Sequence, residues 1–219
     1  MPVFLVHSRR EGALRMKLLT YALYPTMLLS VADPAIAAPK EPWGLDPSPT
    51  ERAAIADFGR CVVKESPAKA HSTLTADFRT AEYRDGLRVL AKVNEGCFRK
   101  RGKMRAGGLP FAAAMAEAMI AKGQAPLNVR LARAGIGKTA PTYAPSDAVA
   151  MCVARSVPDQ VAALFATPIA SEAETKTAGD LLTAVRLCTP KGVSVDIAPY
   201  GLRAILATAS YRLLAAQES

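Results

Sequence analysis

The spacing of the four cysteines constrains this chain more than any other feature of its sequence. Cys61 and Cys97 are 36 positions apart, and so are Cys152 and Cys188. The second pair follows the first at an offset of 91 positions, measured from Cys61 to Cys152. Matched spacing at a fixed offset is typical of an internal repeat, in which one structural unit occurs twice.

Other landmarks align at the same offset. The aligned pairs are residues 61–64 with 152–155, Pro67 with Pro158, Leu90 with Leu181, and the Ala-rich run 109–116 with 200–207. Identity between the aligned segments is low, but their polarity agrees and the alignment needs no gap between the cysteines. The sequence therefore predicts a tandem duplication.

Each copy is predicted to contain four helical pieces. In the first copy they are residues 49–65, a short piece after Pro67, residues 81–94 and residues 109–122; in the second they are residues 147–156, a short piece after Pro158, residues 172–187 and residues 200–216. Ile55, Phe58 and Val62 form one apolar stripe at helical spacing. β-branched alternation is brief, at 193–197. The predicted fold is all-α, with two tandem Cys-stapled helical repeats packed together.

Capping signals support these helix starts. Ser48 with Glu51, and Ser171 with Glu174, have the serine-to-glutamate spacing of a capping box. Pro49 suits the first position of a helix, because a proline there gives up no helical hydrogen bond. These signals therefore support the helix starts at 49 and 172.

The N-terminal 37 residues have the three parts of a secretory signal peptide. Arg9, Arg10, Arg15 and Lys17 form a basic region, an apolar stretch covers 18–32, and Ala-Ile-Ala at 35–37 is a cleavage site of small residues. Met16 is an alternative start. A retained anchor is the competing interpretation, but the apolar stretch is short for a membrane span. The predicted organisation is a signal peptide at 1–37, a Pro-rich leader at 38–48, helical repeat 1 at 49–124, a linker at 125–145 and helical repeat 2 at 146–219.

An exported chain meets an oxidising compartment, where an even number of cysteines indicates disulfides. The duplication favours the pairs Cys61–Cys97 and Cys152–Cys188, one in each copy. Cross-pairing between the copies is the alternative. A zinc site or a redox site is disfavoured, because both use closely spaced pairs such as C-x-x-C and the sequence has none. No cofactor or metal is predicted.

The net charge of +9 is unevenly distributed. Residues 51–140 hold 17 Lys/Arg against 8 Asp/Glu, whereas residues 141–219 hold 6 against 7. The candidate anion-binding cluster consists of Arg99, Lys100, Arg101, Lys103 and Arg105. Such a cluster binds an anionic surface or is simply a solvated loop. The expected partner is an envelope protein or an anionic surface of lipid or lipopolysaccharide. Nucleic acid is disfavoured, because stacking aromatics are missing apart from Phe98.

The remaining motifs are weak. Residues 132–139 nearly spell a phosphate-binding loop, but they lack the strand and helix that such a loop requires. His71, the one histidine after residue 37, has no nucleophile motif to serve. Glu117 is a candidate acid that lacks an obvious second carboxylate. Trp43 either docks on the core or binds a ligand. No catalytic residue is predicted.

The pattern C-V-V-K-E-S-P followed by L-P-F-A-A-A-M-A-E-A-M, repeated as C-V-A-R-S-V-P and L-R-A-I-L-A-T-A-S-Y-R, resembles exported helical proteins of sphingomonad-type α-proteobacteria with two Cys-paired repeats. The resemblance covers most of the chain after residue 37. It implies a helical exported protein and carries over no functional residue, since that group has no assigned activity. We therefore expect a periplasmic or secreted, non-enzymatic binding or interaction protein of the bacterial envelope. The alternative is an envelope hydrolase or wall-modifying enzyme with an unrecognised site.

Overall fold

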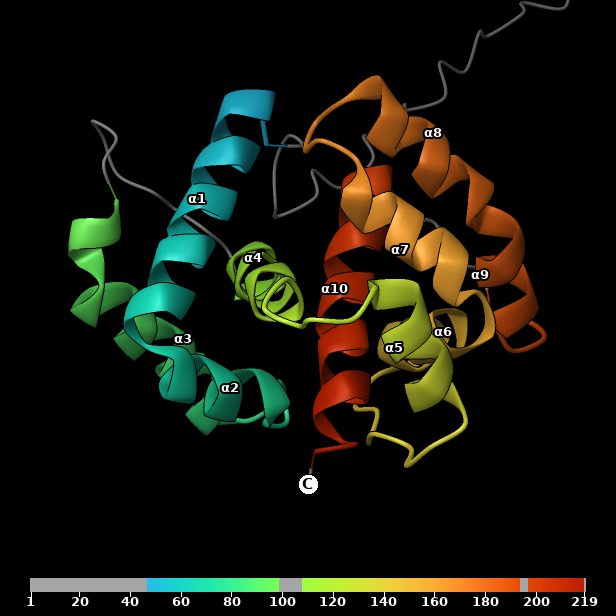
Figure 1. The fold of residues 1–219 in the computed structure, drawn as a ribbon, viewed down its shortest axis with the longest axis horizontal. Helices are drawn as coiled ribbons and strands as arrows, with labels where there is room; N and C mark the ends of the chain where they lie inside the picture. Colours follow the sequence, from blue (N-terminus) through green and yellow to red (C-terminus); the bar gives the residue numbers. More distant parts are fainter. Residues whose placement is uncertain (1–46, 99–107, 194–196, 219) are drawn as a thin grey trace, which may run out of the picture. The chain divides into compact units, whose positions relative to one another are not determined.

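The computed structural model describes residues 47–98, 108–193 and 197–218, and these residues form helices joined by short connections (Figure 1). No strand occurs among the described residues, so the predicted all-α class is confirmed. The elements are α1 (Pro49–Glu65), α2 (Pro67–Thr75), α3 (Ala81–Val93), the 3₁₀ turn η1 (Glu95–Cys97), α4 (Gly108–Ile120), α5 (Leu127–Gly135), α6 (Pro145–Ser156), α7 (Pro158–Ala166), α8 (Glu172–Asp180), α9 (Leu182–Cys188) and α10 (Pro199–Ala215). We call α1–α4 the first half and α6–α10 the second half.

Helix α1 begins as its sequence predicts. The Ser48 hydroxyl accepts a hydrogen bond from the Glu51 N–H at 3.3 Å, and the Ser48 N–H donates to the Glu51 carboxylate at 2.7 Å. These two bonds complete a capping box, which satisfies N–H groups that the first turn leaves unpaired. The helix ends at Ser66, because the following Pro67 cannot continue it.

The element boundaries of the two halves follow the same offset of 91 positions as the cysteines. Helices α2 and α7 match at both ends, α1 and α6 match where they end, and α3 and α4 match α8 and α10 where they begin. Even the breaks agree, since Ser66 has φ −134° and ψ 54° and Val157 has φ −134° and ψ 58°. Equivalent residues therefore give the same local backbone in both halves.

Each half is closed by its own disulfide. Cys61 of α1 pairs with Cys97 of η1, with Cα atoms 5.7 Å apart, and Cys152 of α6 pairs with Cys188 of α9, with Cα atoms 5.8 Å apart. This is the predicted pairing, and cross-pairing between the halves is wrong. Closing a loop of this length stabilises a fold by about 3–4 kcal/mol through the entropy of the unfolded chain. The disulfides also indicate an oxidising, extracytoplasmic location.

Helices α4 and α10 form the centre of the core. Figure 1 shows α4 nearly end-on between α1 and α10, and both contacts are extensive. Small side chains allow the close approach, because a Cβ added to Gly59 of α1 would lie 2.6 Å from the Cβ of Ala114 of α4. The largest fully buried apolar side chains come from both halves and from α5: Leu90, Met115, Leu131, Leu164, Leu181, Leu202, Leu206 and Leu213. One core therefore joins the two halves.

Two regions differ from the expectation. The segment expected as a linker at 125–145 contains α5, which buries Leu131 and Ala134 against α6, α7 and α10. Its Gly- and Pro-rich flanks conceal a short apolar stripe. The piece expected at 172–187 is divided into α8 and α9 at Leu181, directly after Gly179 and Asp180, which are both poor helix formers.

Within the described residues, no single helix is both long and apolar enough to span a membrane. Helices α6 and α7 meet the length and composition criteria only as a pair, and they are bent by 101° where they meet.

Candidate functional site

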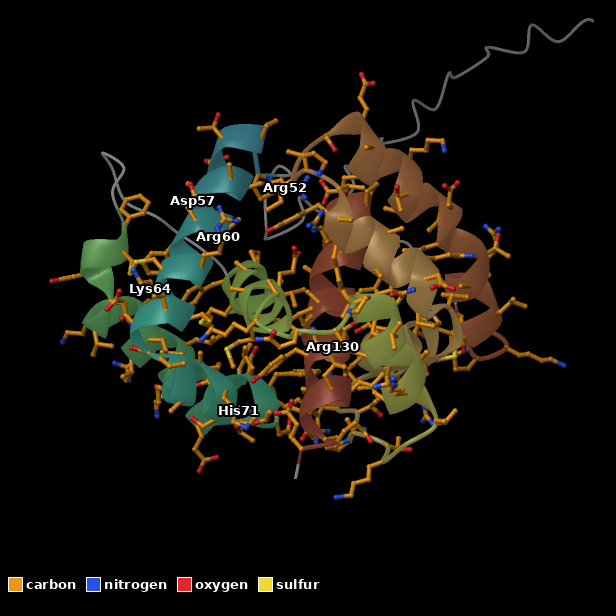
Figure 2. All side chains as sticks on the ribbon, in the orientation of Figure 1. Arg52, Asp57, Arg60, Lys64, His71 and Arg130 are labelled. Carbon is orange, nitrogen blue, oxygen red and sulfur yellow. A yellow bond between two sulfur atoms is a disulfide. The ribbon has the colours of Figure 1, made fainter. Side chains whose placement is uncertain are left out.

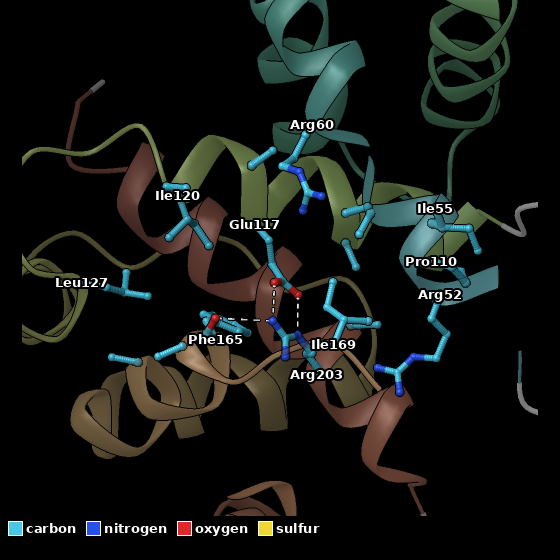
Figure 3. Close-up of a pocket in the computed structure, with 18 of the residues that line it drawn as sticks. Arg52, Ile55, Arg60, Pro110, Glu117, Ile120, Leu127, Phe165, Ile169 and Arg203 are labelled. Carbon is cyan, nitrogen blue, oxygen red and sulfur yellow. Dashed lines mark hydrogen bonds and ion pairs between the residues drawn. The ribbon is translucent and has the colours of Figure 1, made fainter. Parts of the chain in front are cut away.

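A pocket of about 410 Å³ lies where α1, α4, α5, α7 and α10 meet (Figure 3). This volume falls within the range of about 300–1,000 Å³ that small-molecule sites occupy. Alanine is the most frequent lining residue, and larger apolar side chains come from Ile55, Ile120, Leu127, Phe165 and Ile169. Its charged lining residues are Arg52, Arg60, Glu117, Arg130 and Arg203.

The centre of the pocket is an ion pair between α4 and α10. The Arg203 Nε and Nη2 atoms donate to the two carboxylate oxygens of Glu117 at 2.8 and 2.7 Å, which is a bidentate arrangement (Figure 3). The Arg203 side chain is only 5% exposed, and it also donates to the Thr167 carbonyl at 3.2 Å. Burial by itself would lower the pKa of Arg203, but the hydrogen bonds and charge of Glu117, with the charge of Glu174, leave that pKa raised.

A second ion pair joins α1 to α8. The Arg52 Nη2 atom donates to Glu174 Oε1 at 2.5 Å, and the Glu174 side chain is only 1% exposed. The other Glu174 oxygen accepts from the N–H of Ala170 at 2.7 Å. Ala170 has φ 61°, a left-handed conformation that costs a non-glycine residue about 1–2 kcal/mol. Glu174 therefore holds both Arg52 and the backbone turn before α8.

The two ion pairs form one network. Arg203 Nη1 lies 3.6 Å from Glu174 Oε1, so Arg203 attracts both carboxylates. The Arg52 guanidinium also lies 4.5 Å from the centre of the Tyr200 ring. The Arg52 Nε atom is buried and has no hydrogen-bond partner among the described residues. The Nε–H group of Arg52 is therefore a donor that no acceptor among the described residues uses.

The other two arginines have weaker partners. Arg60 pairs with Asp57 one turn away on α1, and both side chains are about two-thirds exposed, so solvent screens the pair. Arg130 Nη1 donates to the Ile120 carbonyl at the end of α4 at 2.7 Å. Gly123 leaves room for this guanidinium, because a Cβ there would lie 2.0 Å from Arg130 Nη1. Figure 2 shows Arg52 and Arg60 on α1 and Arg130 on α5.

The arrangement favours binding of an anion over proton transfer. Glu117 lines the pocket, but both of its oxygens accept hydrogen bonds from the Arg203 guanidinium, so this carboxylate is already engaged in the wall of the pocket. Within the described ranges, no group of three or more His, Cys, Asp or Glu side chains could hold a metal ion.

His71 lies elsewhere, on α2 (Figure 2). Its Nδ1 atom is 2.7 Å from the Tyr211 hydroxyl of α10, beside a smaller cavity of about 200 Å³. Burial raises the pKa of Tyr211 to about 12. Arg212 borders this cavity and forms a buried ion pair with Asp147 of α6. His71 and Glu117 line separate cavities and share no hydrogen bond.

No other predicted candidate is among the described residues that line the pocket. The cluster Arg99, Lys100, Arg101, Lys103 and Arg105 lies outside the described residues, as does Trp43. Residues 132–139 begin at the end of α5 and continue as a loop to α6 at Pro145, instead of leading from a strand into a helix. They therefore lack the geometry of a phosphate-binding loop.

Sequence reasoning missed Arg52, Arg203 and Glu174. Arg203 stands among apolar residues of α10, which is buried on nearly every side, and a charge in such a helix requires a partner. The charge in this apolar helix indicates that Arg203 has a partner, but the sequence does not identify Glu117 as that partner. Glu174 was interpreted as part of a capping box. Ser171 does accept from the Glu174 N–H at 3.1 Å, but the carboxylate turns inward to Arg52 instead of closing the box.

No known protein family, no curated protein and no solved structure matches this chain. The site is therefore interpreted from its own geometry.

Proposed function

We propose that this chain is a non-enzymatic binding protein of the bacterial envelope, and that the pocket at α1, α4, α5, α7 and α10 is its ligand site. The observation that carries the proposal is the combination of about 410 Å³ of space, apolar walls and four arginines at one place. Ligand sites are typically concave and mostly apolar, with a few polar groups that orient the ligand. This pocket has each of these properties.

Binding suits the pocket better than catalysis. Catalysis needs a group that changes its protonation or attacks a substrate. The carboxylate of Glu117 is instead held by Arg203, and Glu174 is held by Arg52 and by the Ala170 N–H. Paired charges of this kind fix the pocket wall, so the site is preorganised for a ligand.

Export is part of the proposal. The basic, apolar and small-residue parts of residues 1–37 support cleavage after Ala37, and the two disulfides fit an oxidising compartment. The protein would then act in the periplasm or outside the cell. Mass spectrometry of the exported protein should find an N-terminus at residue 38, and an intact residue 1–37 segment would contradict this part.

We also propose that the two halves are copies of one unit. The support is the shared offset of 91 positions in the cysteines, in both ends of α2 and α7, and in the caps Thr80 and Ser171. In this interpretation the pocket arose where two copies pack against each other, and the charges of α10 and α8 were acquired in the second copy.

The ligand-site proposal is tested with the neutral fluorophore N-phenyl-1-naphthylamine, whose emission rises in apolar surroundings. Ala162 lines the pocket from α7, and the Ala162→Trp variant should fill part of the space and abolish most of the emission increase. The neighbouring Ala163 is exposed and does not line the pocket, so Ala163→Trp is the matched control. Equal emission from both variants and the unchanged protein, at equal thermal stability, would reject the pocket as a binding site.

A further inference from the structure

We propose that the pocket selects an amphipathic monoanion, a molecule with a straight alkyl chain and one negatively charged head group, and that Arg60 binds the head. This inference rests on the proposed function, because it names the ligand class of the same pocket. It follows from the apolar group that Ile120, Leu127 and Phe165 form in the pocket, and from the pairing of the four arginines.

Apolar side chains lie on both sides of the Glu117–Arg203 pair, and one group of them lies away from Arg52. In Figure 3, Ile120, Leu127 and Phe165 lie together on one side of the pair, whereas Ile55, Pro110 and Ile169 lie on the other side with Arg52. An alkyl chain placed against the first group would bury apolar surface, which contributes about 25 cal/mol for each Å² removed from water. This end therefore suits the tail of the ligand.

The charges leave a positive surplus. Arg203 is paired with Glu117 and Arg52 with Glu174, so these four groups balance. The surplus comes from Arg60 and Arg130. The guanidinium of Arg130 donates to the carbonyl of Ile120 at the C-terminal end of α4, where the helix dipole is negative and already attracts a cation.

Arg60 is the cation with the least compensation inside the pocket. Its partner Asp57 is 62% exposed and faces solvent, so the ion pair is weak and readily exchanged. Figure 3 shows the Arg60 side chain directed toward Glu117, above the centre of the pocket. Arg60 is itself 61% exposed, which places it at the mouth. A head group there would keep part of its hydration while the tail enters.

The remaining groups explain why one charge is favoured. A guanidinium binds a carboxylate, sulfate or phosphate oxygen through charge-assisted hydrogen bonds. Arg130, the other surplus cation, already donates to the Ile120 carbonyl, so a second negative charge would lack a guanidinium comparable to Arg60. A cationic head group would be repelled by the guanidinium groups of Arg60 and Arg203. A monoanion is therefore preferred to a dianion, to a neutral molecule and to a cation.

The test uses calorimetric titration of the folded, disulfide-bonded protein with three ten-carbon probes: decanoate, 1-decanol and decyltrimethylammonium. Decanoate should bind about tenfold more tightly than 1-decanol, since a charge-assisted hydrogen bond contributes at least this much in affinity. The cationic probe should bind most weakly. Added salt should weaken decanoate binding and leave 1-decanol unchanged.

The decisive variant is Arg60→Gln. It should weaken decanoate about fivefold and leave 1-decanol unchanged, as expected for loss of one partly exposed charge. Arg88→Gln is the matched control, because Arg88 has the same one-turn pairing with Asp85 on α3, is similarly exposed and does not line the pocket. Arg60→Lys keeps the charge and should retain most of the affinity for decanoate.

The outcomes separate this inference from the proposed function. Equal affinities for decanoate and 1-decanol, or an equal loss of affinity for both probes in Arg60→Gln, would overturn the choice of a monoanion but not the pocket as a binding site. Loss of decanoate binding in Arg130→Gln but not in Arg60→Gln would overturn the assignment of the head group to Arg60. Failure of all three probes, together with unchanged fluorophore emission in Ala162→Trp, would overturn the ligand site itself.

Discussion

The two halves share several helix boundaries but bury different kinds of side chains. The first half packs an aromatic cluster, in which the Phe58 ring lies 5.1 Å from that of Phe111 and 6.5 Å from that of Phe98. The positions that match them at the offset of 91 hold Val149, Thr189 and Leu202. The helix boundaries nevertheless agree, so they do not depend on aromatic packing.

The charged residues show the opposite distribution. The buried charged residues among those described are all in the second half: Asp147, Glu174, Arg203 and Arg212. Thr73 and Asn94 are the buried polar residues of the first half in the same set. A buried charge is tolerated only where a partner compensates it, and each of these four has one. The comparison teaches that caps, prolines and disulfides fix the backbone, while buried side chains can change if partners change with them.

The buried charged residues of the second half also contact residues of the first half. Arg203 reaches Glu117, and Glu174 reaches Arg52. The Arg212 guanidinium lies 5.8 Å from the centre of the Phe78 ring of the first half. The charged wall of the pocket therefore depends on the buried charged residues, which distinguish the second half from the first.

The largest effect is expected at Asp147. The Asp147→Ala variant leaves Arg212 buried without its carboxylate and should lower the free energy of unfolding by about 3–5 kcal/mol. The double variant Asp147→Ala/Arg212→Met removes both charges, and the first half has Ala56 at the position that matches Asp147. The double variant should therefore recover at least ~1 kcal/mol relative to the single variant in urea unfolding. A double variant less stable than Asp147→Ala would show that the pair itself is required.

The disulfides should have equal effects. Cys61→Ser/Cys97→Ser and Cys152→Ser/Cys188→Ser each open a loop of the same 36-residue separation. Each double variant should lower the free energy of unfolding by about 3–4 kcal/mol. Urea unfolding of the two variants and of the intact protein measures how much free energy of unfolding each variant loses. A gap of more than about 2 kcal/mol would show that the halves are not energetically equivalent.

The smallest effect is expected at Tyr83, which occupies the position that matches Glu174. Burial raises the pKa of Tyr83 to about 12 from its ordinary value of 10.0. The unfolded chain releases this proton near pH 10 and the folded chain near pH 12, so stability is complete below pH 10 and declines as the pH rises to about 12.

The Tyr83→Phe variant should show a shallower loss of stability across this interval in denaturant unfolding. Absorbance of tyrosinate at high pH provides the second measurement, because the variant should lack one late ionisation. Identical pH profiles for the variant and the unchanged protein would mean that Tyr83 ionises alike in both states.

Much of the fold could be predicted from the sequence because its signals are local. The helix at 49–65 was predicted from a serine, a glutamate and a proline, and the structure has those bounds. The disulfide pairing was favoured by the predicted duplication, which the cysteine spacing and the aligned landmarks indicated. The stripe of α5 was missed because Gly and Pro dominate its surroundings, and the break at Leu181 was missed because an apolar pattern continues across it.

The pocket could not be predicted in the same way. Arg52 and Glu174 are far apart in the sequence, and so are Glu117 and Arg203. Spacing rules connect residues within one helix or one strand, whereas these pairs join different helices. The sequence drew attention to the cluster at 99–105, which lies outside the described residues, and to His71, which lines a different cavity.

The sequence by itself determined the all-α class, the bounds of several helices and the two disulfides, because capping and proline placement act over a few residues and the cysteines have the same spacing in both halves. Only the tertiary structure decided which charges would meet. Packing of α4 between α1 and α10 brings Glu117 to Arg203, and the turn before α8 brings Glu174 to Arg52. A buried charge requires a partner, but its identity is fixed by the packing of whole helices.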